Sequence, residues 1–382
     1  MAARARADSE RRSLQSPSGK ALNNFVPVCL AARGYTDGVL QDNLEKEILN
    51  TGCTELDLSE NLITQRGASI LAKVIRLNKL THLYLANNRI GDKGAKYIAE
   101  ALKGRQVLVE LRLGGNEIET KGAQYLAAAL EVNKMLSRLY LQSNKIGDEG
   151  CHYFATILLT NTTLTHLSLV NNRIESNGAK ALANALNTNK VLILLDLWNN
   201  EVKDEGVKAL ATTLATNKTL THLYLGKNEV TDTGAKALAD ALKNQNNTLT
   251  HLYLRKNKIT KAGAEELAKA LETNRSLREL YLFGNLLENE VTHAFGNALR
   301  RNITLLVLDL AGSGINNDGA QALARALEKN RCLTILDLAD NNIEDDGVDS
   351  LIDAIMSRGS RFTLSVEILL PDSILTFCEH GM

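Results

Sequence analysis

Residues 80–102 read LTHLYLANNRIGDKGAKYIAEAL, and close copies of this stretch recur along the chain of 382 residues. The stretch returns as LTHLSLVNNRIESNGAKALANAL at residues 164–186 and as LTHLYLGKNEVTDTGAKALADAL at residues 220–242. One asparagine marks a common register, with Ser313 in the slot between the last two: Asn61, Asn88, Asn116, Asn144, Asn172, Asn200, Asn228, Asn257, Asn285 and Asn341. Neighbouring slots are about 28 residues apart, and a fixed period of this length predicts a solenoid of stacked units. The chain contains eleven such units of the form LxxLxLxxNxIxxxGAxxLAxALxxN.

Each unit combines a strand pattern with a helix pattern. In Leu83, Tyr84 and Leu85 the apolar residues alternate, which predicts a short strand with its leucines inside and its tyrosine outside. The amide of Asn88 can then bond backbone groups in a buried turn, and Gly94 allows tight backbone geometry before the next element. The residues that follow carry apolar side chains at helical spacing. Neither element buries its apolar face alone, so the units must stack.

This pattern resembles the leucine-rich repeats of the ribonuclease-inhibitor type, the same class of repeat that is also found in NOD-like receptors and Ran GTPase-activating proteins. The resemblance covers residues 53–358. It implies an α/β solenoid in the shape of a horseshoe, with a parallel sheet on the concave face and helices on the convex face.

The two ends of the array predict caps, because a terminal repeat would otherwise expose its core. Val28 and Leu30 precede Leu56 and Leu58 by one repeat length and predict a partial strand, and a helix is expected over residues 37–49. Leu364 and Val366 continue the register at the other end. The sequence therefore divides into a disordered polar arm (1–24), an N-terminal cap (25–52), eleven repeats (53–358) and a C-terminal cap and tail (359–382).

Composition argues against several classes of protein. Lys plus Arg and Asp plus Glu both number 44, and without a basic excess neither nucleic acid nor an anionic membrane surface is a favoured partner. No apolar run is long enough to span a bilayer, and no signal peptide is visible. Residues 1–20 carry arginines and serines, but Asp8 and Glu10 favour a polar arm over a transit peptide. We expect a cytoplasmic protein, with nuclear residence left open.

No motif in the chain indicates catalysis or a cofactor. The patterns GxxxxGK[ST], HExxH and GxSxG are absent, and the five cysteines form no CxxC pair. His82, His166, His222 and His251 share the slot before the first strand leucine. The last two belong to adjacent repeats, where strands lie about 4.8 Å apart, so they could share a metal. Duplication of the repeat explains these histidines as well. We therefore predict no metal site, and we also predict no enzyme activity and no cofactor.

The outward strand slot is where a function is expected to show. Five of the nine tyrosines lie between two strand leucines, and Trp198 and Phe283 lie two residues after that slot. Tyrosine, tryptophan and arginine are the most frequent anchors of protein interfaces. Cross-strand packing of tyrosines within the sheet is the structural alternative. The predicted protein-binding residues are Tyr84, Tyr140, Trp198, Tyr224, Tyr253, Arg255, Tyr281 and Phe283.

Three functions follow from the repeat pattern and the resemblance. The first is a non-enzymatic scaffold that binds a protein partner on its concave face and rim. The second, implied by the resemblance, is a GTPase-activating protein for a small GTPase of the Ran type. The acidic tail of that family is missing, since this chain ends in ILTFCEHGM. The third is an innate-sensing repeat protein similar to NOD-like receptors without their ATPase domain. The scaffold is the preferred hypothesis, and the sequence leaves the partner and the oligomeric state open.

Overall fold

A computed structural model of the chain describes residues 30–31, 36–38, 40, 44, 48–50, 52–104, 107–244, 246–358, 362–366 and 376–377. The predicted polar arm (1–24) lies outside these residues, as do large parts of both predicted caps. The chain forms two compact units. The first unit contains residues 1–146, 163–172 and 195–198, and the second contains residues 147–162, 173–194 and 199–382.

Every repeat contributes one short strand, as the alternating leucines predict. The first unit contains β1 (Leu30–Ala31), β2 (Glu55–Asp57), β3 (His82–Tyr84), β4 (Glu110–Arg112), β5 (Arg138–Tyr140) and β6 (His166–Ser168). The second unit contains β8 (His222–Tyr224), β9 (His251–Tyr253), β10 (Glu279–Tyr281), β11 (Val307–Asp309), β12 (Ile335–Asp337), β13 (Thr363–Ser365) and β14 (Thr376–Phe377), while β7 (Leu194–Asp196) has residues in both units. Within each unit, strands that are neighbours in the chain pair in parallel and in register, and among the described strands only β14 runs antiparallel to its neighbour.

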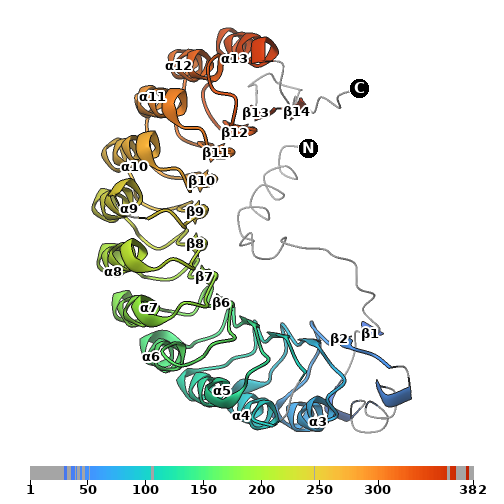
Figure 1. Cartoon of the computed structure of the whole chain (residues 1–382). Coiled ribbons are helices and arrows are strands. Elements are labelled where there is room, and N and C mark those ends of the chain that lie inside the picture. The colour runs from blue at the N-terminus through green and yellow to red at the C-terminus, as the bar shows by residue number, and fades with distance from the viewer. Residues whose placement is uncertain are drawn as a thin grey trace. The chain divides into compact units, whose positions relative to one another are not determined.

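One helix follows each strand of a repeat. The helices of the first unit are α3 (Gln65–Arg76), α4 (Gly91–Leu102) and α5 (Thr120–Val132). Those of the second unit are α6 (Gly147–Leu158), α7 (Ser176–Thr188), α8 (Lys203–Thr216), α9 (Asp232–Asn244), α10 (Lys261–Thr273), α11 (Val291–Arg301), α12 (Asn317–Leu327) and α13 (Asp345–Arg358). In each unit the helices stand side by side on one side of the strands (Figure 1). Leu83, Leu85 and Ile98 are among the fully buried side chains that fill the layer between them. The predicted α/β repeat architecture is confirmed.

The register asparagines tie consecutive repeats together, as the sequence predicts. Asn116 is fully buried, and its Nδ2 donates to the carbonyl oxygens of Leu85 (2.7 Å) and Gly114 (3.0 Å). Its Oδ1 accepts from the amide of Ile90 at 3.4 Å. The residue before each register position has a φ between 53° and 72°: Glu60, Asn87, Gly115, Ser143, Asn171, Asn199, Lys227, Lys256, Gly284, Gly312 and Asp340. This left-handed residue turns the chain out of the strand and toward the helix.

The sequence predicts the strand register correctly at the C-terminal end of the array and wrongly at the N-terminal end. Leu364 pairs with Leu336, which confirms the predicted register at the C-terminal end. At the N-terminal end Leu30 pairs with Leu56 and not with Leu58, so the predicted register is wrong there. Val28 lies outside the described residues.

Val291 stands where most repeats have glycine, and the preceding repeat explains why. A Cβ atom on Gly263 would lie 2.5 Å from Oδ1 of Asp232, which accepts hydrogen bonds from the amides of Thr260 and Gly263. In the next repeat the position of Asp232 is taken by Lys261, which cannot accept these bonds. The carboxylate that lies against Gly263 thus has no equivalent beside the fully buried Val291.

Candidate binding face

The side of the strands that points away from the helices, here called the helix-free face, carries a charged network in the first unit. Glu110 on β4 is buried, and its two carboxylate oxygens each accept from an arginine Nε at 2.6 Å, one from Arg112 and one from Arg138. Nη2 of Arg138 lies 3.2 Å from Nε2 of His82. Because arginine can only donate, His82 accepts at Nε2 and carries its proton on Nδ1, which lies 3.3 Å from Glu55.

Two tyrosines enclose the guanidinium of Arg112. Its central carbon lies 4.6 Å from the ring centroid of Tyr84 on β3 and 5.1 Å from that of Tyr140 on β5. The strand register causes this arrangement, since Tyr84, Arg112 and Tyr140 occupy the same slot of three neighbouring strands. Burial and the nearby Glu110 carboxylate raise the pKa of Tyr84 to about 12, so its hydroxyl stays protonated at neutral pH.

Trp198, predicted on the open surface, is only 4% exposed. Its backbone amide donates to the carboxylate of Asp196 at 3.1 Å, and its carbonyl accepts from the amide of Asn171. The side chain of Trp198 is therefore almost completely covered and leaves little area for a partner.

In the second unit three tyrosine rings stack along neighbouring strands. The ring centroids of Tyr224 and Tyr253 are 4.2 Å apart, and so are those of Tyr253 and Tyr281. The stack leaves only 3% of Tyr224 and 4% of Tyr253 exposed, while Tyr281 is half-buried. The hydroxyls of Tyr253 and Tyr281 both donate to Oε2 of Glu279, at 3.1 Å and 2.9 Å. A partner would therefore meet ring edges and Tyr281, because the ring faces cover one another.

The adjacent histidines of the second unit also stack. The ring centroids of His222 and His251 are 3.9 Å apart with an angle of 12° between the planes. Nε2 of His251 lies 3.2 Å from Glu279, and the Nδ1 atoms of both rings bond to the hydroxyls of Thr221 and Thr250. Imidazole binds a metal through a ring nitrogen and not through its face, so this stacking does not form a metal site. In the described part of the chain no group of three or more potential metal ligands comes together.

Arg255 and Phe283 complete the predicted residues of the second unit. The guanidinium of Arg255 lies over the ring of Tyr281, 4.5 Å from its centroid, and binds the carboxylate of Asp309. Burial raises the pKa of Asp309 to about 6, although Arg255 acts in the opposite direction. Phe283 is half-buried, and Nζ of Lys256 lies 5.6 Å from its ring centroid.

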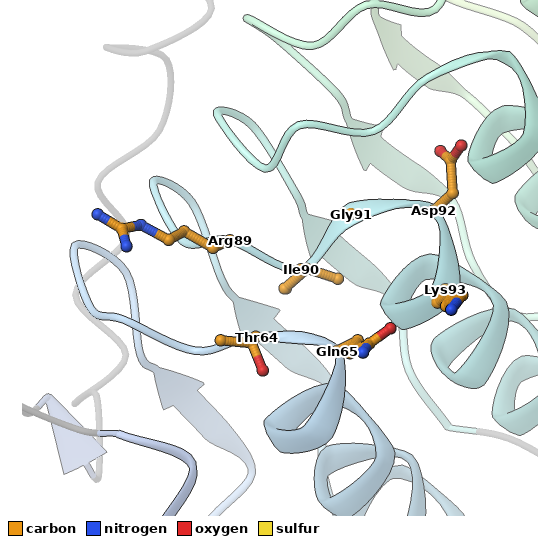
Figure 2. Close-up of a pocket in the computed structure, with 7 residues that line it drawn as sticks. All are labelled: Thr64, Gln65, Arg89, Ile90, Gly91, Asp92 and Lys93. Carbon is orange, nitrogen blue, oxygen red and sulfur yellow. The ribbon is translucent and has the colours of Figure 1, made fainter.

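A shallow pocket lies in the first unit between the turns that precede α3 and α4, and seven residues line it: Thr64, Gln65, Arg89, Ile90, Gly91, Asp92 and Lys93. The charged ends of Arg89, Asp92 and Lys93 point in different directions and do not converge on one point (Figure 2). The pocket therefore presents no arrangement that would hold a particular ligand.

Comparison with known sequences places this fold in a family. The family described as "Leucine Rich repeat" matches residues 76–99, 106–127, 132–155, 160–183, 188–211, 216–239, 245–268, 301–324 and 329–351, more than half of the chain. The chain belongs to the leucine-rich repeat family. The segment around Val291 is one of the stretches between the matched repeats. No curated protein matches the sequence.

Two solved structures are similar to this chain at low identity and low TM-score. One is the complex of Rad7 and Elc1 from yeast, at 19% identity and a TM-score of 0.46, with 82% of this chain and 81% of that chain covered. Another is actin-binding site 2 of leiomodin-1, at 22% identity and a TM-score of 0.31, with 47% of this chain and 90% of that chain covered. No helix in the described part of the leucine-rich repeat chain is long and apolar enough to cross a bilayer.

The predicted residues thus separate into two groups. Tyr84 and Tyr140 meet around Arg112 in the first unit, while Tyr224, Tyr253, Arg255, Tyr281 and Phe283 lie on neighbouring strands of the second. Arg112 and Glu110 are not among the binding residues predicted from the sequence. A signal for Arg112 was present, because tyrosine occupies the same slot in the repeat before it and in the repeat after it.

Proposed function

We propose that this protein is a non-enzymatic scaffold that binds a protein partner on the helix-free face of its strands. The observation that carries the proposal is the concentration of aromatic and arginine side chains there. Aromatic residues make up only 4% of the chain, yet Tyr224, Tyr253 and Tyr281 stack on adjacent strands. Leucine-rich repeat proteins commonly bind other proteins, and the family is typically non-catalytic.

The side chains of this face are held in place before any partner arrives. Tyr253 and Tyr281 are fixed by stacking and by their bonds to Glu279, and Arg255 is fixed by Asp309. Immobilising a flexible side chain on binding costs about 0.5–1.5 kcal/mol, and a side chain that is already ordered avoids this cost. The stacked tyrosines and the ion pair therefore favour association.

The eight predicted residues have different parts in this proposal. Tyr84, Tyr140, Tyr281 and Phe283 are half-buried, so each still has area to offer a partner. Trp198, Tyr224 and Tyr253 are nearly covered and act by supporting the surface. Arg255 offers a guanidinium whose charge Asp309 already balances.

Affinity capture from native lysate tests the proposal with the double variant Tyr281→Ala/Phe283→Ala. Tyr97→Ala on α4 is the matched control, because Tyr97 is an aromatic residue, 46% exposed, on the helix side. We expect a protein that is held by the wild type and by Tyr97→Ala and is lost from the double variant. The purified partner should bind the double variant at least about tenfold more weakly, the size of effect at interface anchors.

Equal capture by the wild type and the double variant, with circular dichroism showing an intact fold, would contradict the proposal. Loss of capture in Tyr97→Ala alone would place the binding surface on the helices. If the captured partner is a small GTPase, a GTP hydrolysis assay will distinguish a scaffold from an activating protein.

A further inference from the structure

Arg112 and Arg255 differ in how many of their guanidinium hydrogen-bond donors are already used. Arg255 uses both Nε (2.7 Å) and Nη2 (2.6 Å) to bind Asp309. Arg112 uses only Nε, which donates to Glu110. Among the described residues, no atom accepts a hydrogen bond from its two terminal amino groups. The side chain is 41% exposed, so these groups have access to a ligand.

The enclosure of Arg112 determines which part of it is accessible. Tyr84 covers one face of the guanidinium and Tyr140 covers the other, while Nε faces the buried Glu110. The edge formed by the two terminal amino groups is what remains for a ligand. This edge is the part of arginine that binds a carboxylate or phosphate through two parallel hydrogen bonds.

The two tyrosines that enclose Arg112 also carry hydroxyl donors. Neither the Tyr84 hydroxyl nor the Tyr140 hydroxyl forms a hydrogen bond with any described residue. Burial raises the pKa of both groups, so both hydroxyls keep their protons at neutral pH. A guanidinium edge and two tyrosines with protonated hydroxyls supply several donors on one surface, and such a surface suits an anion with several acceptor atoms.

We propose that Arg112, flanked by Tyr84 and Tyr140, binds an Asp or Glu carboxylate in an acidic segment of a protein partner. This inference rests on the proposed function, since it gives the chemistry of one contact on the same helix-free face. The site lies on the surface of the strands and not in an enclosed cavity. A partner segment can add contacts with the tyrosine rings, which a free small carboxylate cannot.

The local charge favours a carboxylate over a phosphate group. The network around Arg112 contains two arginines (Arg112 and Arg138) and two glutamates (Glu55 and Glu110), whose formal charges cancel. A phosphate group carries a charge of about −1.5 to −2 at neutral pH, so both glutamates would repel it more strongly than they repel a single carboxylate. A carboxylate carries a single negative charge and matches the planar guanidinium edge.

Nuclear magnetic resonance of the full chain tests this contact with a defined probe, the peptide acetyl-tetraglutamate-amide. The Nε–Hε signal of Arg112 is assigned by its absence from Arg112→Lys. We expect a saturable shift of this signal on titration at constant ionic strength. In Arg112→Lys, binding is followed by the backbone amide signals of β3, β4 and β5, and it should be weaker by at least about tenfold, because lysine keeps the charge but lacks the planar guanidinium. Tyr84→Phe and Tyr140→Phe keep both rings and should each weaken binding by about two- to fivefold through loss of a donor.

Arg275→Lys is the matched control, because Arg275 is an exposed arginine whose Nη1 bonds the carbonyl of Glu272 at the end of α10. It should leave binding unchanged. No saturable shift, equal binding by Arg112→Lys, or tighter binding of inorganic phosphate than of the peptide would each overturn the inference. None of these outcomes affects the capture experiment, which changes Tyr281 and Phe283 in the second unit, so the two proposals can fail separately.

Discussion

The guanidinium of Arg255 passes over the ring of Tyr281 and binds the carboxylate of Asp309, which lies two strands further along the sheet. Both Nε and Nη2 donate to Oδ2 of Asp309, at 2.7 Å and 2.6 Å. The side chain of Asp309 is only 1% exposed, and that of Arg255 is 22% exposed. Three neighbouring strands, β9 to β11, are thus joined by one ion pair stacked on one aromatic ring.

Arg255→Ala should destabilise the protein by about 3 kcal/mol at pH 8, since it leaves a buried carboxylate without its cation. The pKa of Asp309 is already about 6, and removing Arg255 raises it further. At pH 5 the carboxyl group is protonated, so the loss should be much smaller. Urea unfolding at the two pH values measures this difference. Transition midpoints are the quantity to compare, because repeat arrays can unfold with limited cooperativity.

The double variant Arg255→Ala/Asp309→Asn is the control for this prediction. It removes the unpaired charge and should regain part of the stability at pH 8. An equal loss at pH 5 and pH 8 in the single variant would show that Arg255 acts through packing and not through its charge.

Ser313→Asn should stabilise the protein by about 1 kcal/mol. In the other repeats the asparagine of this slot bonds backbone groups of the preceding repeat, as when Oδ1 of Asn285 accepts from the amide of Ile259 at 3.1 Å. Oγ of Ser313 instead bonds the carbonyl of Ala311 in its own repeat. Asparagine would reach the amide of Leu287, the equivalent of Ile259. Thermal unfolding measures the gain, with Ser313→Ala as the control that lacks the amide. A variant that is less stable than the wild type would refute this account of the slot.

Leu225→Ala should cost about 2–5 kcal/mol through the cavity that it leaves in the core, because Leu225 is fully buried. Strand alternation alone predicts that Tyr224→Ala costs less than half as much. The structure changes that expectation, since Tyr224 is 3% exposed and stacks on Tyr253. We now expect Tyr224→Ala to cost about 2–4 kcal/mol.

Urea unfolding of the two alanine variants tests this expectation, with Tyr224→Phe as the control that keeps the aromatic ring. Tyr224→Phe should stay within about 1 kcal/mol of the wild type. If Tyr224→Ala costs less than about 1 kcal/mol, the stack adds little to stability and the original expectation was right.

His166 should make the stability of the first unit depend on pH. Burial, together with Arg138, lowers the pKa of His166 below its ordinary value of 6.5. Between the lowered pKa and 6.5 the unfolded chain binds more protons than the folded chain, so stability falls as the pH drops through this window. His166→Asn should flatten the pH dependence of the urea midpoint between pH 7.5 and pH 5.

Direct titration of the His166 ring by nuclear magnetic resonance checks the cause of this effect. The midpoint should lie below 6.5 in the wild type. Replacing Arg138 by glutamine removes a nearby positive charge and should move the midpoint upward. A wild-type midpoint above 6.5 would contradict the burial argument.

The strands and helices of the fold were largely predictable from the residues that recur in each repeat. The leucines of each strand, the asparagine of each turn and the apolar spacing of each helix lie within a single repeat unit. Leu83, Leu85 and Asn116 are buried as their positions predict. Local period determines which side of a strand or helix is apolar, and it can be read without knowing what packs against it.

The candidate site was predictable only in part. The sequence placed tyrosines in the outward slot, but it did not show that Tyr224 and Tyr253 cover each other, or that Trp198 is 4% exposed. Exposure depends on the neighbouring strand, whose residues lie about one repeat away in the chain. Tyrosines in the same slot of the repeats before and after Arg112 were a signal in the sequence, but only the structure shows that Tyr84 and Tyr140 enclose its guanidinium.

The sequence by itself determined the repeat, the order of strand and helix in each unit, and the face of the strands on which the predicted binding residues lie. Only the tertiary structure decided which of those side chains are available. Parallel pairing brings side chains from different repeats into contact, such as Arg138 with Glu110 and Arg255 with Asp309. Stacking and ion pairing between strands use up some polar and aromatic groups and leave others free, because each group has a limited number of faces and hydrogen-bonding atoms.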